Sequence, residues 1–243
     1  TLSSGPLQFL AIADQDRIDG VSAVAADIWS QRGAGTERDG LALAAVREQR
    51  SELWLTNTQV NFCARAYPTV PTEHPDAAPL TVLGGVLRNG FLHRAIREQG
   101  GAYGGGSSQD SGVAAFRFFS YRDPRLEETL SDFDAAIDWM LSTRHEPRAL
   151  EEAILGVIGS LDKPGSPAGE AKQHFHNHLF GRSHAQREEF RQRVLGVTLD
   201  DLLRVTQTYL QPERASTAVI APAGQAEATA ELRNELGLSL REL

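Results

Sequence analysis

The chain has 243 residues, of which 41% are hydrophobic and 23% are charged, and its formal net charge is -8. This composition is typical of a globular protein with one domain of about 200 residues and an appendage. The negative charge argues against a sequence-independent grip on nucleic acid, and no apolar run approaches the roughly 20 residues that span a bilayer.

The single cysteine, Cys63, cannot form an intramolecular disulfide, so a reducing compartment fits without being required. The chain begins at Thr1, without a methionine or a basic-then-apolar leader, so we expect it to be processed, trimmed or cut from a longer protein. The compartment stays open among cytoplasm, organellar matrix and periplasm, with the cytoplasm favoured.

The first part of the chain predicts short elements separated by breaks. Residues 7–13, LQFLAIA, are a candidate strand, and apolar residues from Ile18 to Trp29 then recur at helical spacing. The segment SQRGAGTERDG ends that helix, and a further short helical pattern runs from Leu41 to Gln49.

Hairpin-like strands are expected next, within WLTNTQVNFCARAYP. Apolar residues alternate there with Asn61, Cys63 and Arg65, as on a half-buried strand. Several prolines between 68 and 79 then predict a loop.

From Leu80 the pattern becomes helical, with Arg97 in the last turn and Gly100 where a helix end prefers a left-handed residue. The segment GVAAFRFFSYRDP predicts a strand. Because it carries aromatic residues on both faces, we expect both faces to be covered.

The remainder is mostly helical. Apolar spacing predicts helices within 126–140 and 150–161, a helix between Ser183 and Gly196, and another within 199–209. ASTAVIAP is the last strand candidate, and a helix with Leu232 and Leu236 follows it. This order predicts an α+β fold rather than a regular βαβ alternation.

The glycine-rich stretch IREQGGAYGGG, residues 96–106, has three interpretations. A phosphate loop needs its glycines ahead of a helix, whereas these follow one, and no Gly-Lys-Ser/Thr is present. A helix stop explains Gly100 and Gly101 but leaves Gly104 to Gly106 without a structural task. Glycines along a strand edge would let an extended peptide approach closely.

The histidines of HFHNHLFGRSH, namely His174, His176, His178 and His184, are a candidate metal site, although surface histidines are the simpler explanation. Neither HExxH nor HxxEH occurs in the chain. No G-x-S-x-G motif is present, and Cys63 lies mid-strand with no histidine nearby in sequence, so a serine or cysteine nucleophile is not supported.

The segment LHRAIREQGGAYGGG…SGVAAFRFFSYRDP resembles the C-terminal domain of presequence protease, in the pitrilysin and insulin-degrading enzyme group of inverted zinc metallopeptidases. The resemblance continues through ILGVIGSLDKPGSPAGEA and REEFRQRVLGVTLDDLLRV, and covers roughly residues 54–225. It implies a mixed, largely antiparallel β-sheet with helices packed on it. Residues 53–243 would form this domain, and residues 1–52 would end a preceding domain or connect to it.

In that family two halves close around a chamber, and the N-terminal half carries zinc on an HxxEH motif. The C-terminal half contributes an arginine and a tyrosine six residues apart, which Arg97 and Tyr103 match. The resemblance therefore implies catalytic roles for Arg97 and Tyr103, substrate binding at Gly100, Gly101, Gly104 and Gly105, and no metal ligand in this chain.

The implied partners are an N-terminal metal-carrying half and unfolded peptides, without nucleic acid or membrane. By itself the chain is expected to be inactive. The alternatives are a separate non-catalytic binding or assembly subunit of the same fold and a metal-binding protein that uses the histidine cluster.

Overall fold

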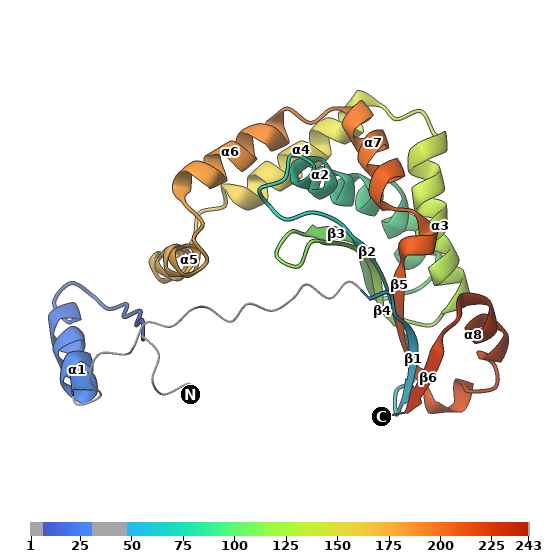
Figure 1. Ribbon diagram of the computed structural model, residues 1–243, viewed down its shortest axis with the longest axis horizontal. Coiled ribbons are helices and arrows are strands. Elements are labelled where there is room, and N and C mark those ends of the chain that lie inside the picture. Colours follow the sequence, from blue (N-terminus) through green and yellow to red (C-terminus); the bar gives the residue numbers. More distant parts are fainter. Residues whose placement is uncertain (1–6, 31–47, 243) are drawn as a thin grey trace. The chain divides into compact units, whose positions relative to one another are not determined.

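The computed structural model describes residues 7–30 and 48–242 (Figure 1). The chain divides into two compact units. The smaller comprises Thr1–Val46 and Lys163–His184, and the larger comprises Arg47–Asp162 and Ala185–Leu243. None of the helices in the described ranges combines the length and the apolar character needed to cross a membrane.

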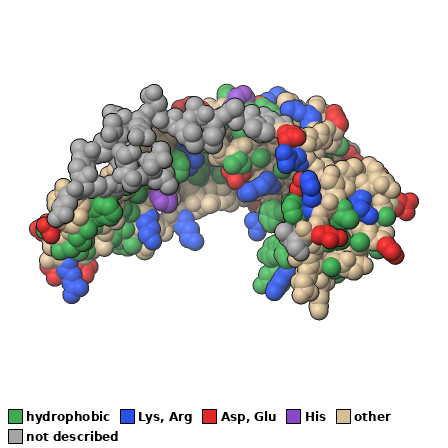
Figure 2. Space-filling model, turned by 60° about the horizontal axis from the view of Figure 1, so that its bottom comes forward, with side chains coloured by type: hydrophobic (Ala, Val, Ile, Leu, Met, Phe, Trp, Pro, Cys, Tyr) green, Lys and Arg blue, Asp and Glu red, His purple; other side chains and the backbone are tan. Residues whose placement is uncertain are grey.

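The smaller unit contains α1 (Ile18–Ser30) and α5 (Pro167–Leu179), neither of which has a buried residue. Phe9 packs on Trp29 with the ring centroids 5.2 Å apart, and both side chains remain exposed. Exposed apolar side chains of α1, such as those of Val24 and Ile28, belong to the hydrophobic side chains that are green in Figure 2.

Two predictions for the first 50 residues have different outcomes. The helix expected from Ile18 is confirmed by α1. The strand expected over 7–13 is wrong, because residues 7–14 form no regular element. A lone strand would leave its backbone groups unpaired. Most of the helix expected from Leu41 lies outside the described residues.

The larger unit is built on a mixed sheet whose described strands follow the order β3-β4-β2-β5-β1-β6. The strands are β1 (Ser51–Thr56), β2 (Asn61–Pro68), β3 (Gly104–Asp110), β4 (Ala115–Asp123), β5 (Ser216–Pro222) and β6 (Ser239–Glu242). Three neighbouring pairs are antiparallel, and β1 is parallel to both β5 and β6. The largely antiparallel α+β fold is therefore confirmed. The hairpin expected around residue 58 is wrong, since β5 lies between β1 and β2.

The helices of this unit are α2 (Ala77–Leu87), the π-helix η2 (Arg88–Gln99), α3 (Glu127–Ser142), α4 (Pro147–Leu161), α6 (His184–Leu195), α7 (Leu199–Tyr209) and α8 (Ala230–Leu236), with short 3₁₀ turns η3 (Pro212–Arg214) and η4 (Ala223–Gln225). The helix predicted from Leu80 thus starts earlier, and its second half is wound as a π-helix. Helices α2, α3 and α7 lie on one side of the sheet (Figure 1).

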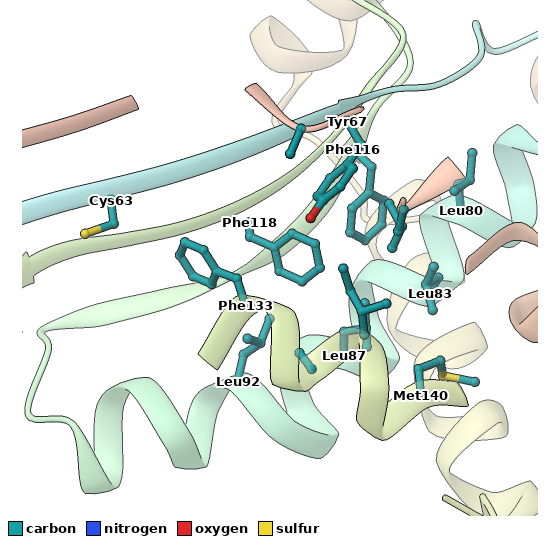
Figure 3. Packing of buried hydrophobic residues seen from close by; sticks show 14 of the residues in the cluster. Cys63, Tyr67, Leu80, Leu83, Leu87, Leu92, Phe116, Phe118, Phe133 and Met140 are labelled. Carbon is teal, nitrogen blue, oxygen red and sulfur yellow. The ribbon is translucent and has the colours of Figure 1, made fainter. Parts of the chain in front are cut away.

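The core lies between these helices and the sheet (Figure 3). Phe118 packs edge-on against Phe116 and Tyr67 and meets Phe133 of α3 at a centroid distance of 5.6 Å. Burial of each such ring contributes about 2 kcal/mol, so this cluster holds β2, β4 and α3 together.

The buried face of β2 is the one that carries the more polar side chains. Asn61, Cys63 and Arg65 are buried against the helices, and Arg65 forms an ion pair with Asp134 of α3. Phe62 and Ala64 lie on the opposite face. The cover expected on both faces of β4 is found on one face only within the described residues, because Tyr121 on the other face is 39% exposed.

Candidate functional site

Arg97 and Tyr103 lie at the two ends of one hydrogen-bonded turn between η2 and β3. The Gly101 N–H donates to the Arg97 carbonyl at 3.1 Å, and the Ala102 N–H donates to the Ile96 carbonyl at 3.1 Å. The left-handed residue is Gly101, with φ +80°, whereas Gly100 has φ -81°. The sequence thus located the helix end to within one residue.

Tyr103 is 65% exposed and sits directly before the edge strand β3. Its N–H donates to the Arg122 carbonyl at 3.3 Å. Its ring lies 5.6 Å from the Tyr121 ring between centroids, and the Arg122 guanidinium carbon lies 5.9 Å from the centroid of the Tyr103 ring. The phenol is therefore fixed against β4 while remaining accessible.

Arg97 is exposed in the last turn of η2. Its Nη1 lies 3.4 Å from the His93 Nε2, and the His93 Nδ1 lies 3.3 Å from a Glu98 carboxylate oxygen. A guanidinium has five N–H donors, and this contact uses one of them. No hydrogen bond or ring contact joins Arg97 to Tyr103 in the described part of the chain.

The glycines of this stretch have close neighbours in the chain itself. A Cβ on Gly100 would lie 1.9 Å from the Arg125 Nη2, and one on Gly104 would lie 2.6 Å from the Tyr121 ring. A Cβ on Gly105 would lie 2.8 Å from the Ile96 Cγ2 and 2.9 Å from the Phe119 carbonyl oxygen. Close packing thus gives Gly104 and Gly105 the structural task that the sequence did not reveal.

A polar network behind the turn joins β4 to η2 and α3. The Asp123 carboxylate accepts hydrogen bonds from the Thr129 hydroxyl at 2.8 Å and from the Arg125 N–H at 3.0 Å. The Arg125 Nη2 donates to the Ala95 carbonyl at 3.2 Å and to Asp132 at 2.9 Å. Sequence reasoning missed this network, although the Asp-Pro step that opens the turn before α3 was its visible signal.

The histidine cluster does not assemble into a metal site. His174, His176 and His178 lie on α5 and His184 begins α6, and all four side chains are exposed. Among the described residues, no group of three or more His, Cys, Asp or Glu side chains is arranged to hold a metal ion. Residues 7–30 and 48–242 therefore offer no side-chain arrangement that fits zinc.

Cys63 is buried on the helix-facing side of β2. Burial raises the pKa of its thiol to about 12. A thiol in this state is a poor nucleophile, in agreement with the sequence analysis.

The sheet face turned away from the helices carries a shallow apolar groove of about 540 Å³. Trp54, Phe62, Phe119, Tyr121 and Ile220 line it. Tyr121 connects the groove to the Arg97–Tyr103 region, since its ring lies over Gly104 and beside Tyr103.

Comparison with known proteins connects this geometry to a family. The family described as PreP C-terminal domain matches residues 51–221. The protein named presequence protease, mitochondrial, from Yarrowia lipolytica is 40% identical over 173 residues, which cover 71% of this chain and 17% of that protein. Its namesake from Xenopus tropicalis is 38% identical over 165 residues, which cover 67% of this chain and 16% of that protein.

The chain spans about a sixth of the length of these curated relatives. Among solved structures, a protease from Helicobacter pylori aligns with a TM-score of 0.66 at 12% identity, over 88% of this chain and 54% of that one. Pitrilysin aligns with a TM-score of 0.65 at 16% identity, over 93% of this chain and 25% of that one. These two structures share the fold, and the match over residues 51–221 shows that the chain belongs to the PreP C-terminal domain family.

Proposed function

We propose that this chain is the C-terminal, non-zinc-carrying portion of a zinc metalloendopeptidase that degrades short unfolded peptides. In this proposal, Arg97 and Tyr103 bind the peptide and stabilise the transition state of its hydrolysis. The observation that carries the proposal is their joint placement, exposed at the two ends of one rigid turn, within a chain of this family.

The chemistry needs hydrogen-bond donors at the scissile carbonyl. Peptide hydrolysis places negative charge on the carbonyl oxygen, and a guanidinium or phenol aimed at that oxygen stabilises the charge. Arg97 offers a cation with unused donors, and the Tyr103 hydroxyl belongs to a ring held by two neighbours. Both groups therefore have the character that the reaction requires.

The edge of β3 supports a place for the peptide. β3 is the terminal strand of the described sheet, and a peptide in extended conformation could pair with its backbone, beginning beside Tyr103. We assign Gly100, Gly101, Gly104 and Gly105 to this subsite. Without side chains they let η2, β4 and the peptide approach the same short segment of backbone.

The remaining parts of the proposal concern the complete protein. Because the described residues do not fit zinc, we assign the metal to an N-terminal half that would be the partner of this chain. Residues 1–52 would then end the preceding domain or connect to it. The curated relatives are mitochondrial by name, which supports an organellar location over the cytoplasmic one favoured by the sequence.

The test uses the complete protein and an unstructured fluorogenic peptide. Tyr103→Phe and Arg97→Ala should each lower kcat/KM about 100-fold or more, as loss of one transition-state donor does. Tyr121→Phe and Arg94→Ala are matched controls on the neighbouring ring and the same helix, and both should keep near-normal activity. Full kcat/KM in both Tyr103→Phe and Arg97→Ala would refute the proposal and favour a non-catalytic subunit of the same fold.

A further inference from the structure

Arg122 has a backbone conformation that its side chain does not favour. Its φ is +52°, and Ala114 in the β3–β4 turn, with φ +53°, is the other non-glycine residue with a positive φ in the described part of the chain. This left-handed region is costly for residues that carry a Cβ, so surrounding contacts must maintain it.

Contacts at its carbonyl and at the residue that follows hold Arg122 in this conformation. Its carbonyl accepts the Tyr103 N–H, and the next residue, Asp123, is buried and anchored by Thr129 and by the Arg125 N–H. The strained backbone conformation of Arg122 is therefore maintained by hydrogen bonds at the end of β4.

The positive φ changes which side chains meet Tyr103. Successive residues of a regular strand point to opposite faces. Here Tyr121 and Arg122 follow each other in β4, yet the Tyr121 ring and the Arg122 guanidinium both lie against the Tyr103 ring, at 5.6 Å and 5.9 Å. Because Gly104 pairs with Tyr121, Arg122 lies opposite Tyr103, and the broken alternation leaves both the cation and the Tyr121 ring against this phenol.

We propose that Arg122 is a positioning residue that holds the Tyr103 ring, so that the hydroxyl is presented in one orientation to the peptide. The inference rests on the proposed function of Tyr103. A guanidinium within about 6 Å of a ring centroid is attracted to that ring. At an exposed site such as this one, the attraction limits the motion of the ring without burying it.

The test is a series of variants of the complete protein, assayed with the same peptide. Arg122→Gln removes the charge at similar length, and Arg122→Gly also removes the backbone strain. Both should lower kcat about twofold to fivefold, the fold-change expected for an exposed cation–π contact, with KM nearly unchanged. Arg122→Lys keeps a cation and should recover part of the loss.

Stability separates positioning from a purely structural role. Arg122→Gly should leave the thermal unfolding midpoint unchanged or raised, because glycine adopts φ +52° at no steric cost. Ala114→Gly is the matched control, since it relieves the same backbone conformation away from Tyr103. It should leave kcat unchanged.

The decisive measurement is a double-mutant cycle with Tyr103→Phe. If Arg122 acts through the Tyr103 hydroxyl, Arg122→Gln should have no further effect on kcat in the Tyr103→Phe background. An equal loss in both backgrounds would overturn the inference, because Arg122 would then act without Tyr103. Normal kcat in Arg122→Gln and Arg122→Gly, beside a large loss in Tyr103→Phe, would overturn the inference alone. Normal kcat/KM in Tyr103→Phe would overturn the inference, and the same result in Arg97→Ala would refute the proposed function as well.

Discussion

Gly100 has no room for a methyl group. An added Cβ would lie 1.9 Å from the Arg125 Nη2 and 2.5 Å from the Ile96 carbonyl oxygen. Arg125 cannot move aside freely, because its hydrogen bonds to Ala95 and Asp132 tie β4 to η2 and α3. Gly100→Ala should therefore lower the free energy of unfolding by about 2 kcal/mol, measured by denaturant unfolding of the 243-residue chain.

The matched control is a glycine in open space. Gly156 is exposed in α4, and a Cβ there would have no neighbour within 4 Å. Gly156→Ala should raise the free energy of unfolding by up to about 1 kcal/mol, since alanine favours a helix interior. Similar effects of the two substitutions would show that close packing at Gly100 does not determine its identity.

Individual residues differed in how far the sequence revealed them. The spacing of Arg97 and Tyr103 was visible because both belong to one short segment. The tasks of Gly104 and Gly105 were hidden, because the atoms that crowd them belong to Tyr121, Phe119 and Ile96. Arg122 could not be found either, since its positive φ depends on contacts made across the sheet.

At the scale of elements, Asp76 connects α7 to the start of α2. Its carboxylate accepts hydrogen bonds from the Arg204 Nη2 and the Tyr209 hydroxyl, both at 2.7 Å. Burial alone would raise the pKa of Asp76, but these two hydrogen bonds together with the charges of Arg204 and His74 hold the pKa below its usual value. The helix that leads toward Arg97 is thus anchored at its first turn by a charged group.

Because the pKa of Asp76 is lowered in the folded state, its stabilising contribution is present above the unfolded pKa of about 4. The contribution is lost as the pH falls through the folded pKa. Asp76→Asn should lower the free energy of unfolding by about 2 kcal/mol at pH 7, and the difference from the unaltered chain should shrink below about pH 4. Unfolding curves of both chains across this pH range measure the effect.

Asp162→Asn is the control for a surface ion pair. Asp162 bonds Arg191 at 2.9 Å on the surface, where solvent screens the pair, so its loss should matter less. The free energies of unfolding of Asp76→Asn and the unaltered chain should converge at low pH. If their difference stays constant down to pH 2, the role assigned to the Asp76 carboxylate is contradicted.

Apolar periodicity predicted the long helices well, because each buries one stripe of side chains. It failed for β3, whose Gly-Gly-Gly-Ser-Ser sequence lacks the branched and aromatic residues typical of strands. The buried face of β2 also differed from its pattern. Arg65 is tolerated inside because Asp134 pairs with it, whereas Phe62 faces the open groove.

At the scale of the whole molecule, the strand order exceeds what local patterns can predict. β5 pairs with β1 and β2 although it lies about 150 residues further along the chain, so the hairpin suggested by proximity does not form. The sequence supported an α+β fold through its order of elements. The pairing depends on contacts that become apparent only once the chain is folded.

The division of function between this chain and an N-terminal half is the last prediction. The sequence contains no HxxEH motif, and the described residues do not fit zinc. The 243-residue chain with added zinc should therefore leave an unstructured fluorogenic peptide intact. A mixture with the N-terminal half should cleave the peptide, because Arg97 and Tyr103 would then face a metal site.

Cleavage by the mixture but not by either part would identify a composite site, and Tyr103→Phe in this chain should lower that cleavage about 100-fold. Chelator-sensitive cleavage by the chain alone would contradict the division. It would move the metal site to the exposed histidines of α5, and His174→Ala with His178→Ala should then abolish the activity. Any affinity tag is removed before the assay. The result then decides whether the chain contributes to a composite catalytic site or contains a complete metal site.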